Sequence, residues 1–183
     1  MWNKIISQQK YPFFFVVLSL FFSNSIIAQT INTKYSYVSF KAKNMEVKTV
    51  KGSISDMQGE VHWNEKDFSS VRMQACLGVK TISTGTPKRD EHLLEEDFFD
   101  AEKYPNICFV STQITEENKN YIVTGKLTIR NITKEVKIPF TVAKNLFSGT
   151  FTINRFDFDL GKDSNTFMIS EEIEITIKCL IHN

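Results

Sequence analysis

The residues best suited to chemistry gather in one short segment, residues 86–99. Arg89, Asp90 and His92 lie close together there, and Glu96 follows His92 by four positions. On a helix, the side chains of His92 and Glu96 would be one turn apart and could share a metal ion. A structural metal site needs about four ligands and a catalytic site about three, and no further His or Cys lies at a matching spacing. We therefore predict no metal site.

Two interpretations of Arg89, Asp90 and His92 remain open. In the first, which we favour, the three side chains attach a short helix to its neighbours by hydrogen bonds and charge pairing, since surface helices commonly carry acids in their first turn. In the second, they lie at the rim of a binding site and meet the polar or phosphate head group of a ligand.

Motifs of common enzymes are absent from the sequence. It contains no Gly-rich phosphate loop and no Gly-x-Ser-x-Gly nucleophile elbow, and its acidic residues are scattered. The formal net charge of +1 gives no reason to expect a nucleic acid as partner. The sequence therefore predicts a protein that is not an enzyme and does not bind nucleic acid.

The first 28 of the 183 residues have the pattern of a secretory signal peptide. Lys4 and Lys10 precede an apolar run over residues 11–22, and Ala28 provides a small residue at the expected cleavage point. The apolar run is shorter than the ~20 residues that a membrane-spanning helix needs, although an uncleaved anchor is the alternative. We expect cleavage near Ala28, no stable membrane span afterwards, and a periplasmic or secreted protein with one domain over residues 29–183.

Beyond residue 28 the sequence alternates between apolar and polar residues, the pattern of strands with one buried face. The segment from Val71 to Lys80 is the clearest case, and Arg130-Asn131 separates two long alternating segments as a tight hairpin would. The count of about eight such segments predicts an all-β sandwich or barrel, and the one-sided patterning favours a single sheet that curls to cover its own apolar face. A short helical segment near residues 87–99 interrupts the strands after Thr86 and Pro87, which suit a helix start.

The three cysteines fall on different strand faces. Cys76 and Cys108 lie on polar faces, and Cys179 lies on an apolar face. Cys76 and Cys108 can form a disulfide only if their strands are neighbours, because the bond demands close Cα atoms. The sequence leaves this pairing open.

Several blocks of the sequence resemble the signature of the YceI-like family. Residues 81–109 contain Thr-Gly, then Arg-Asp-Glu-His-Leu, then Asp-Phe-Phe and Tyr-Pro-Asn-Ile-Cys-Phe, in the order of the family pattern. Residues 125–134 and 154–158 look like its Gly-x-Leu-Thr hairpin and its Arg-x-Asp-Phe block, so that the resemblance covers essentially residues 33–181. It implies a lipocalin-like antiparallel β-barrel that is exported to the periplasm or beyond, and in some members holds a long polyisoprenoid chain.

The apolar strand faces carry the functional hypothesis. Small residues on them, Ala42, Ala75 and Gly125, favour an interior slot over a filled core. Our leading hypothesis is a carrier or store for a polyisoprenoid-like lipid, with no other cofactor. The alternative is an exported stress-response or interaction module with a filled barrel, and a homodimer is left open for either. The side chains expected to line a lipid site are Phe40, Trp63, Met73, Ala75, Leu77, Phe109, Leu127, Ile129, Phe140, Phe151 and Ile153.

Overall fold

The computed structural model describes residues 28–44, 49–117, 120–162 and 169–182. The predicted signal peptide, apart from Ala28, lies outside these residues. The elements in chain order are β1 (Gln29–Thr30), β2 (Tyr37–Asn44), β3 (Thr49–Ile54), β4 (Gln58–His62), β5 (Arg72–Gly78), the 3-10 helix η1 (Val79–Thr81), α1 (Pro87–Leu93), β6 (Asn106–Glu117), β7 (Asn120–Ile129), β8 (Ile132–Ala143), β9 (Leu146–Asn154), the 3-10 helix η2 (Arg155–Phe158) and β10 (Ile169–Leu180). None of the described helices is long and apolar enough to cross a membrane.

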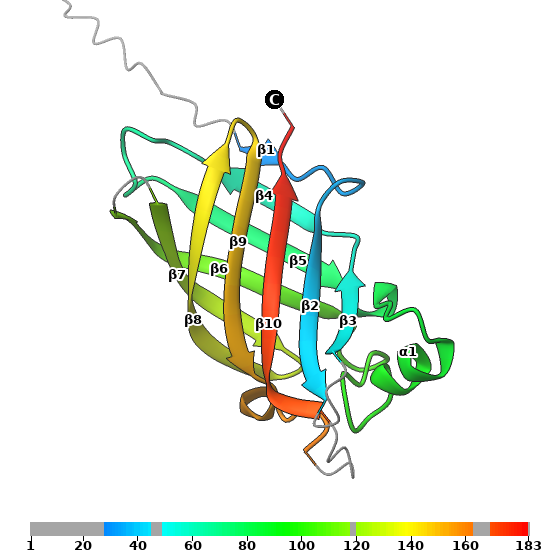
Figure 1. The fold of residues 1–183 in the computed structure, drawn as a ribbon. Coiled ribbons are helices and arrows are strands. Elements are labelled where there is room, and N and C mark those ends of the chain that lie inside the picture. The colour runs from blue at the N-terminus through cyan, green and yellow to red at the C-terminus, as the bar shows by residue number, and fades with distance from the viewer. Residues whose placement is uncertain (1–27, 45–48, 118–119, 163–168, 183) are drawn as a thin grey trace, which may run out of the picture.

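The strands form one antiparallel sheet that curls around its apolar face (Figure 1). Its order is β1-β4-β5-β6-β7-β8-β9-β10-β2-β3, so that most neighbours in the sheet are also neighbours in sequence. Two isolated antiparallel bridges link the edge strands to segments distant in sequence. Ile31, just after β1, pairs with Ile181, and Ser53 of β3 pairs with Ser83. The all-β, lipocalin-like fold class is confirmed, with ten strands among the described residues where the sequence predicted about eight.

The strand β3 explains part of that difference. Its inward positions are Val50, Gly52 and Ile54, an alternation that a glycine interrupts. The ring of Phe40 on β2 lies over Gly52, where an added Cβ would come 2.8 Å from its Cε1 atom. Glycine here makes room for an aromatic ring from the paired strand, and it also weakens the hydrophobic signal that would have identified β3.

The hairpins set the two ends of the sheet. Ile129 pairs with Ile132, so that Arg130 and Asn131 form a two-residue turn in which Arg130 has a φ of 56°. This turn confirms the predicted hairpin. It lies at the same end as η2 and α1, which we call the lower end, and β7 begins at the opposite, upper end (Figure 1).

The helix α1 is shorter than the predicted segment over residues 87–99. It begins after Thr86 with Pro87 in its first turn, as expected, and ends at Leu93. Three acids, at residues 95–97, follow the helix, and negative charge at a helix C-terminus is unfavourable. The chain turns instead, and this turn buries Phe98, whose side chain is 5% exposed.

A disulfide joins Cys76 on β5 to Cys108 on β6. The two residues lie directly opposite each other in the register, with Cα atoms 4.1 Å apart. Their neighbours Leu77 and Ile107 are buried on the inner face, so the alternation of each strand places the disulfide on the outer face. The pairing that the sequence left open is thus resolved by strand register.

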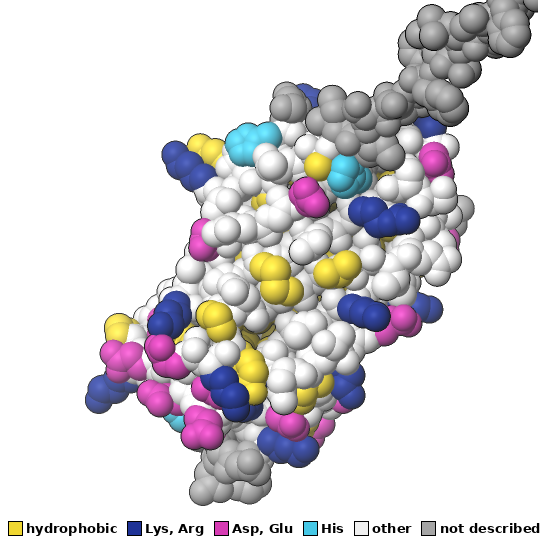
Figure 2. All heavy atoms as spheres, turned by 180° about the vertical axis from the view of Figure 1, so that it is seen from behind, with side chains coloured by type: hydrophobic (Ala, Val, Ile, Leu, Met, Phe, Trp, Pro, Cys, Tyr) yellow, Lys and Arg dark blue, Asp and Glu magenta, His cyan; other side chains and the backbone are white. Residues whose placement is uncertain are grey.

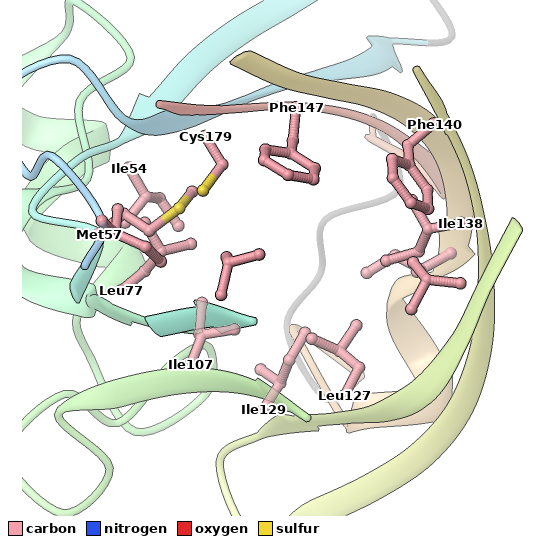
Figure 3. Packing of buried hydrophobic residues seen from close by; sticks show 14 of the residues in the cluster. Ile54, Met57, Leu77, Ile107, Leu127, Ile129, Ile138, Phe140, Phe147 and Cys179 are labelled. Carbon is pink, nitrogen blue, oxygen red and sulfur yellow. The ribbon is translucent and has the colours of Figure 1, made fainter. Parts of the chain in front are cut away.

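The inner face of the sheet gathers the hydrophobic core. Figure 3 shows side chains from opposite parts of the curled sheet, such as Leu77 and Phe140, pointing toward a common centre. On the side of the molecule seen in Figure 2, charged side chains are scattered over the surface and apolar groups lie in small separate clusters. The most exposed large apolar residues described are Tyr35 and Val110.

Candidate functional site

The curled sheet encloses a cavity of ≈ 240 Å³. Its lining residues are almost all hydrophobic and come from both halves of the sheet (Figure 3). A cavity this size can hold a ligand, because an apolar cavity of about 150 Å³ stays dry and already binds benzene. Since an apolar wall offers few hydrogen bonds, such a cavity suits hydrocarbon.

Ten of the eleven side chains predicted to line a lipid site do line this cavity. They come from β2 and from β5 to β9, so that no local stretch of sequence forms the wall by itself. The ten are Phe40, Met73, Ala75, Leu77, Phe109, Leu127, Ile129, Phe140, Phe151 and Ile153.

Trp63 is the exception, and it belongs to an aromatic cluster at the upper end. Its ring centroid lies 5.0 Å from that of Tyr121, 5.3 Å from Phe147, 5.8 Å from Phe140 and 6.0 Å from Phe68. The contacts with Tyr121, Phe140 and Phe147 are edge-to-face, an arrangement that is favourable beyond the area it buries. The cluster lies where β7 begins, and two of its members, Phe140 and Phe147, also line the cavity.

Gly125 shapes the cavity differently from what its small size suggested. The ring of Phe109 lies over it, and a Cβ added at Gly125 would come 2.6 Å from Cε2 of Phe109 and 2.6 Å from the carbonyl oxygen of Val110. The glycine therefore does not leave an open slot; it lets the ring of Phe109 lie flat against the wall. Phe40 and Gly52 are arranged in the same way on β2 and β3. Both pairs keep large rings out of the centre.

We expect a Gly125→Ala variant to lose about 1–3 kcal/mol of unfolding free energy, because the new methyl group forces the ring of Phe109 inward. Denaturant unfolding measures this loss, and uptake of a fluorescent apolar probe measures the smaller cavity. Gly78→Ala is the matched control, because its Cβ would meet nothing closer than 3.6 Å. Equal stability and probe uptake in the two variants would contradict the role of Gly125.

Arg89 and Asp90 attach α1 to the chain before it. Asp90 accepts hydrogen bonds from the backbone N–H of Thr84 at 2.8 Å and from the Thr84 hydroxyl. Arg89 donates from Nε to the same hydroxyl at 2.8 Å and from Nη2 to the Thr84 carbonyl at 3.1 Å and the Thr86 hydroxyl at 3.0 Å. These bonds support the structural interpretation of both residues. Arg89 and Thr84 also line the cavity.

His92 lies away from the cavity lining. Its side chain is 51% exposed, with Nε2 3.5 Å from a carboxylate oxygen of Asp97 and its ring 5.1 Å from that of Phe98. Its acidic neighbour is thus Asp97 and not Glu96. In the described parts of the chain, no group of three or more His, Cys, Asp or Glu side chains could hold a metal ion.

Arg155 is a cavity-lining residue that the sequence did not single out, although it lies in the Arg-x-Asp-Phe block. Its side chain is 5% exposed, and it joins three pieces of chain. Nη1 donates to the carbonyls of Leu160 at 2.6 Å and Gly161 at 3.0 Å, and Nε donates to Ser170 at 3.3 Å. The guanidinium also lies 4.0 Å above the ring of Phe156. Burial lowers the pKa of Arg155, and the charge of Glu171 partly opposes this.

Cys179 adds a buried thiol to the lining. Burial raises its pKa from 9.0 to about 11, although a hydrogen bond with Ser36 acts in the opposite direction. The thiol therefore stays protonated in the folded protein at pH values where an exposed one would ionise.

This thiol predicts a loss of stability at alkaline pH. Between pH 9 and 11 the unfolded chain releases the proton of Cys179 while the folded chain keeps it, so the free energy of unfolding falls as pH rises. The contribution reaches about 2–3 kcal/mol, since each pKa unit corresponds to about 1.4 kcal/mol. Thermal or urea unfolding of wild type and Cys179→Ala tests this: wild type should lose more stability over that window. Parallel pH curves would show that the thiol does not contribute.

Comparison with known sequences gives a match along nearly the whole described chain. The family model of the YceI-like domain matches residues 29–180. Among known protein sequences, a UPF0312 protein of Pectobacterium carotovorum subsp. carotovorum is 26% identical over 154 residues, which cover 79% of this chain and 79% of that protein.

Two solved structures resemble the fold closely. Burkholderia cenocepacia BcnA superposes with a TM-score of 0.76 at 28% identity, covering 84% of this chain and 99% of that one. A polyisoprenoid binding domain from Saccharophagus degradans, implicated in plant cell wall breakdown, superposes with a TM-score of 0.67 over 85% of this chain and 98% of that one. At 11% identity, this second likeness concerns the fold alone.

Proposed function

Because the chain belongs to the family of YceI-like domains, we propose that it binds an apolar lipid of the polyisoprenoid class inside the curled sheet. The observation that carries this proposal is the cavity of ≈ 240 Å³ with its almost wholly hydrophobic lining. The polyisoprenoid binding domain with the same fold supports the choice of lipid class. A binding role, without catalysis, is the function that this wall favours.

The energetics of such a site require little polar chemistry. Transfer of a methylene group from water to an apolar environment yields about 0.8 kcal/mol, so a five-carbon isoprene unit yields roughly 4 kcal/mol before the costs of binding. The flattened rings of Phe40 and Phe109 widen the space for such a chain. The hydrophobic cavity wall would select a ligand by the width and length of its hydrocarbon chain more than by its functional groups.

The cavity also favours this proposal over the alternative of a filled barrel. A filled interior would leave the outer face as the place of function, and on the side seen in Figure 2 the apolar residues lie in small separate groups. We further propose that the protein stores or transports this lipid in the periplasm or outside the cell, after cleavage of the signal peptide near Ala28.

The experiment is to express the full chain in a bacterium, purify the exported protein and identify what it holds. Native mass spectrometry should show a bound mass, and organic extraction should release a prenyl lipid in about equimolar amount. Protein that is empty on isolation and takes up no prenyl lipid from detergent would overturn the proposal. N-terminal sequencing of the same sample tests the cleavage site.

A further inference from the structure

Strand pairing leaves the wall of the cavity open along β3. In the described chain, the edge of β3 that faces away from β2 pairs only through Ser53, which exchanges two backbone hydrogen bonds of 2.9 Å with Ser83. Residues 86–99 follow this bridge, and we call them the α1 segment because they comprise α1 and the turn after it. Figure 1 shows α1 at this end of the sheet. Four residues of the segment line the cavity: Arg89, Leu93, Phe98 and Phe99.

The chain on both sides of the α1 segment is firmly attached. The disulfide between Cys76 and Cys108 joins β5 to β6, the two strands that flank residues 79–105. The backbone N–H of Val79 donates to the carbonyl of Pro105 at 2.8 Å, so the two ends of this loop also meet. The base of the loop is therefore held in place independently of the α1 segment.

The α1 segment itself has few polar attachments to the barrel. Its helix contains no buried residue. Among the described residues, one hydrogen bond joins the segment to chain outside residues 84–101, from the backbone N–H of Gly161 to the carbonyl of Asp97 at 2.7 Å. Phe98 packs over the same glycine, where an added Cβ would come 2.7 Å from its Cζ atom. Segments with so few attachments open at a lower free energy than the strands around them.

Two residues with a left-handed backbone flank the α1 segment. Gly85 has a φ of 74°, and a Cβ added there would meet nothing within 4 Å, so the glycine serves backbone conformation and not packing. Asp100 has a φ of 49°. Hinges lie at loop positions of this kind, where a few residues take up the change in backbone angles. A polar cleft of ≈ 720 Å³ lies between the acids at residues 95–97 and the side chains of Arg130 and Lys162, so the segment has open space along one side.

We propose that the α1 segment is a lid, which opens about Gly85 and Asp100 and forms the passage through which the ligand enters and leaves the cavity. This inference rests on the proposed lipid-binding function and adds the route to the site. In the closed position, Phe98 completes the apolar wall. Opening breaks the hydrogen bond between Gly161 and Asp97 and exposes the cavity beside β3, while the disulfide holds the base of the loop.

Hydrogen exchange followed by NMR tests the opening without any ligand. The N–H of Gly161 is the reporter, because its hydrogen bond to Asp97 breaks when the lid opens, whereas the N–H of Leu160 bonds to Arg155 in its own turn. A Gly85→Ala variant should speed the exchange of Gly161 about tenfold and leave that of Leu160 unchanged, because alanine disfavours the left-handed backbone of the closed lid.

Gly78→Ala is the matched control for the hinge. It makes the same substitution at the base of the loop, where the new Cβ would meet nothing closer than 3.6 Å and the backbone is extended. The exchange of Gly161 should equal that of the wild type in this variant. If Gly85→Ala and Gly78→Ala give the same exchange rate for Gly161, the α1 segment does not open about Gly85 and the lid is overturned.

A cross-link tests whether the ligand passes the lid. Asp97→Cys and Lys162→Cys, in a Cys179→Ala background, place two thiols in the lining of the polar cleft, where a short bis-maleimide can join them. Stopped-flow binding of the neutral fluorescent probe N-phenyl-1-naphthylamine should show association and dissociation rate constants that both fall at least about tenfold on linking, with a nearly unchanged Kd. The same variant capped with N-ethylmaleimide is the control and should keep the rates of the uncapped protein.

The outcomes separate this proposal from the proposed function. If the linked protein binds and releases the probe as fast as the capped protein, the lid is not the passage, while lipid binding stands. If neither the probe nor a prenyl lipid binds to the unlinked protein, the proposed function and the passage fail together, and the exchange of Gly161 still decides whether the segment opens.

Discussion

A Leu77→Trp variant is expected to lose lipid binding while keeping its fold. Leu77 is 8% exposed, lies on the inner face of β5 and lines the cavity. An indole at this position extends into space that a ligand would occupy, so we expect the Kd for a prenyl lipid to rise about 100-fold, the equivalent of about 2.7 kcal/mol of binding free energy. Because the new ring enters a cavity and not a filled core, the free energy of unfolding should change by less than about 1.5 kcal/mol.

The matched control is Val110→Trp on the neighbouring strand β6. Val110 is 45% exposed on the outer face, so the same large side chain there should leave lipid binding unchanged. Fluorescence displacement of a bound apolar probe measures binding, and urea unfolding measures stability. If Leu77→Trp instead loses much of its unfolding free energy, and its lipid binding falls only as far as the loss of folded protein explains, the interior is already full. That result would favour the alternative function.

An Arg155→Leu variant is expected to lose about 2–4 kcal/mol of unfolding free energy. The side chain supplies donors to the carbonyls of Leu160, Gly161 and Ser170, and two of these residues are themselves buried. A buried carbonyl that loses its donor costs about 1–3 kcal/mol. The variant no longer pays the desolvation penalty of a buried charge, so the expected loss of unfolding free energy is smaller than the sum for three lost hydrogen bonds.

Lys162→Leu provides the comparison for Arg155. The Lys162 side chain is 61% exposed and pairs with Asp159 at 3.1 Å, so its loss should cost less than about 1 kcal/mol. Urea unfolding of the three proteins without ligand gives the ordering. If Arg155→Leu proves as stable as Lys162→Leu, the role of Arg155 in holding η2 to β10 is refuted.

The sequence predicted the sheet well because alternation is a local property. Each strand with one apolar face shows it within a few residues, as in the segment from Val71, whatever the rest of the chain does. The turn at Arg130-Asn131 and the helix start at Pro87 are local in the same sense. The helix end was harder, since it depended on the burial of Phe98 against a glycine more than sixty residues away.

The wall of the cavity was predictable for a related reason. Once alternation assigns a face, every apolar residue on that face must point inward, and ten of eleven chosen side chains do line the cavity. Trp63 was wrongly predicted to line the cavity, because the alternation shows on which face of the sheet a residue lies but not its position along the barrel axis. It packs with rings from β7, β8 and β9 at the upper end.

By itself the sequence determined which side chains face inward, and therefore that this is an all-β protein with an apolar interior. Only the tertiary structure decided that Cys76 meets Cys108, that the ring of Phe109 lies over Gly125, and that Arg155 is buried in the cavity wall. The physical reason is distance along the chain. The two-residue period of the strand backbone determines on which face of the sheet a side chain lies. Contacts between distant strands depend on strand register and sheet curvature, and these are set by the whole sheet together.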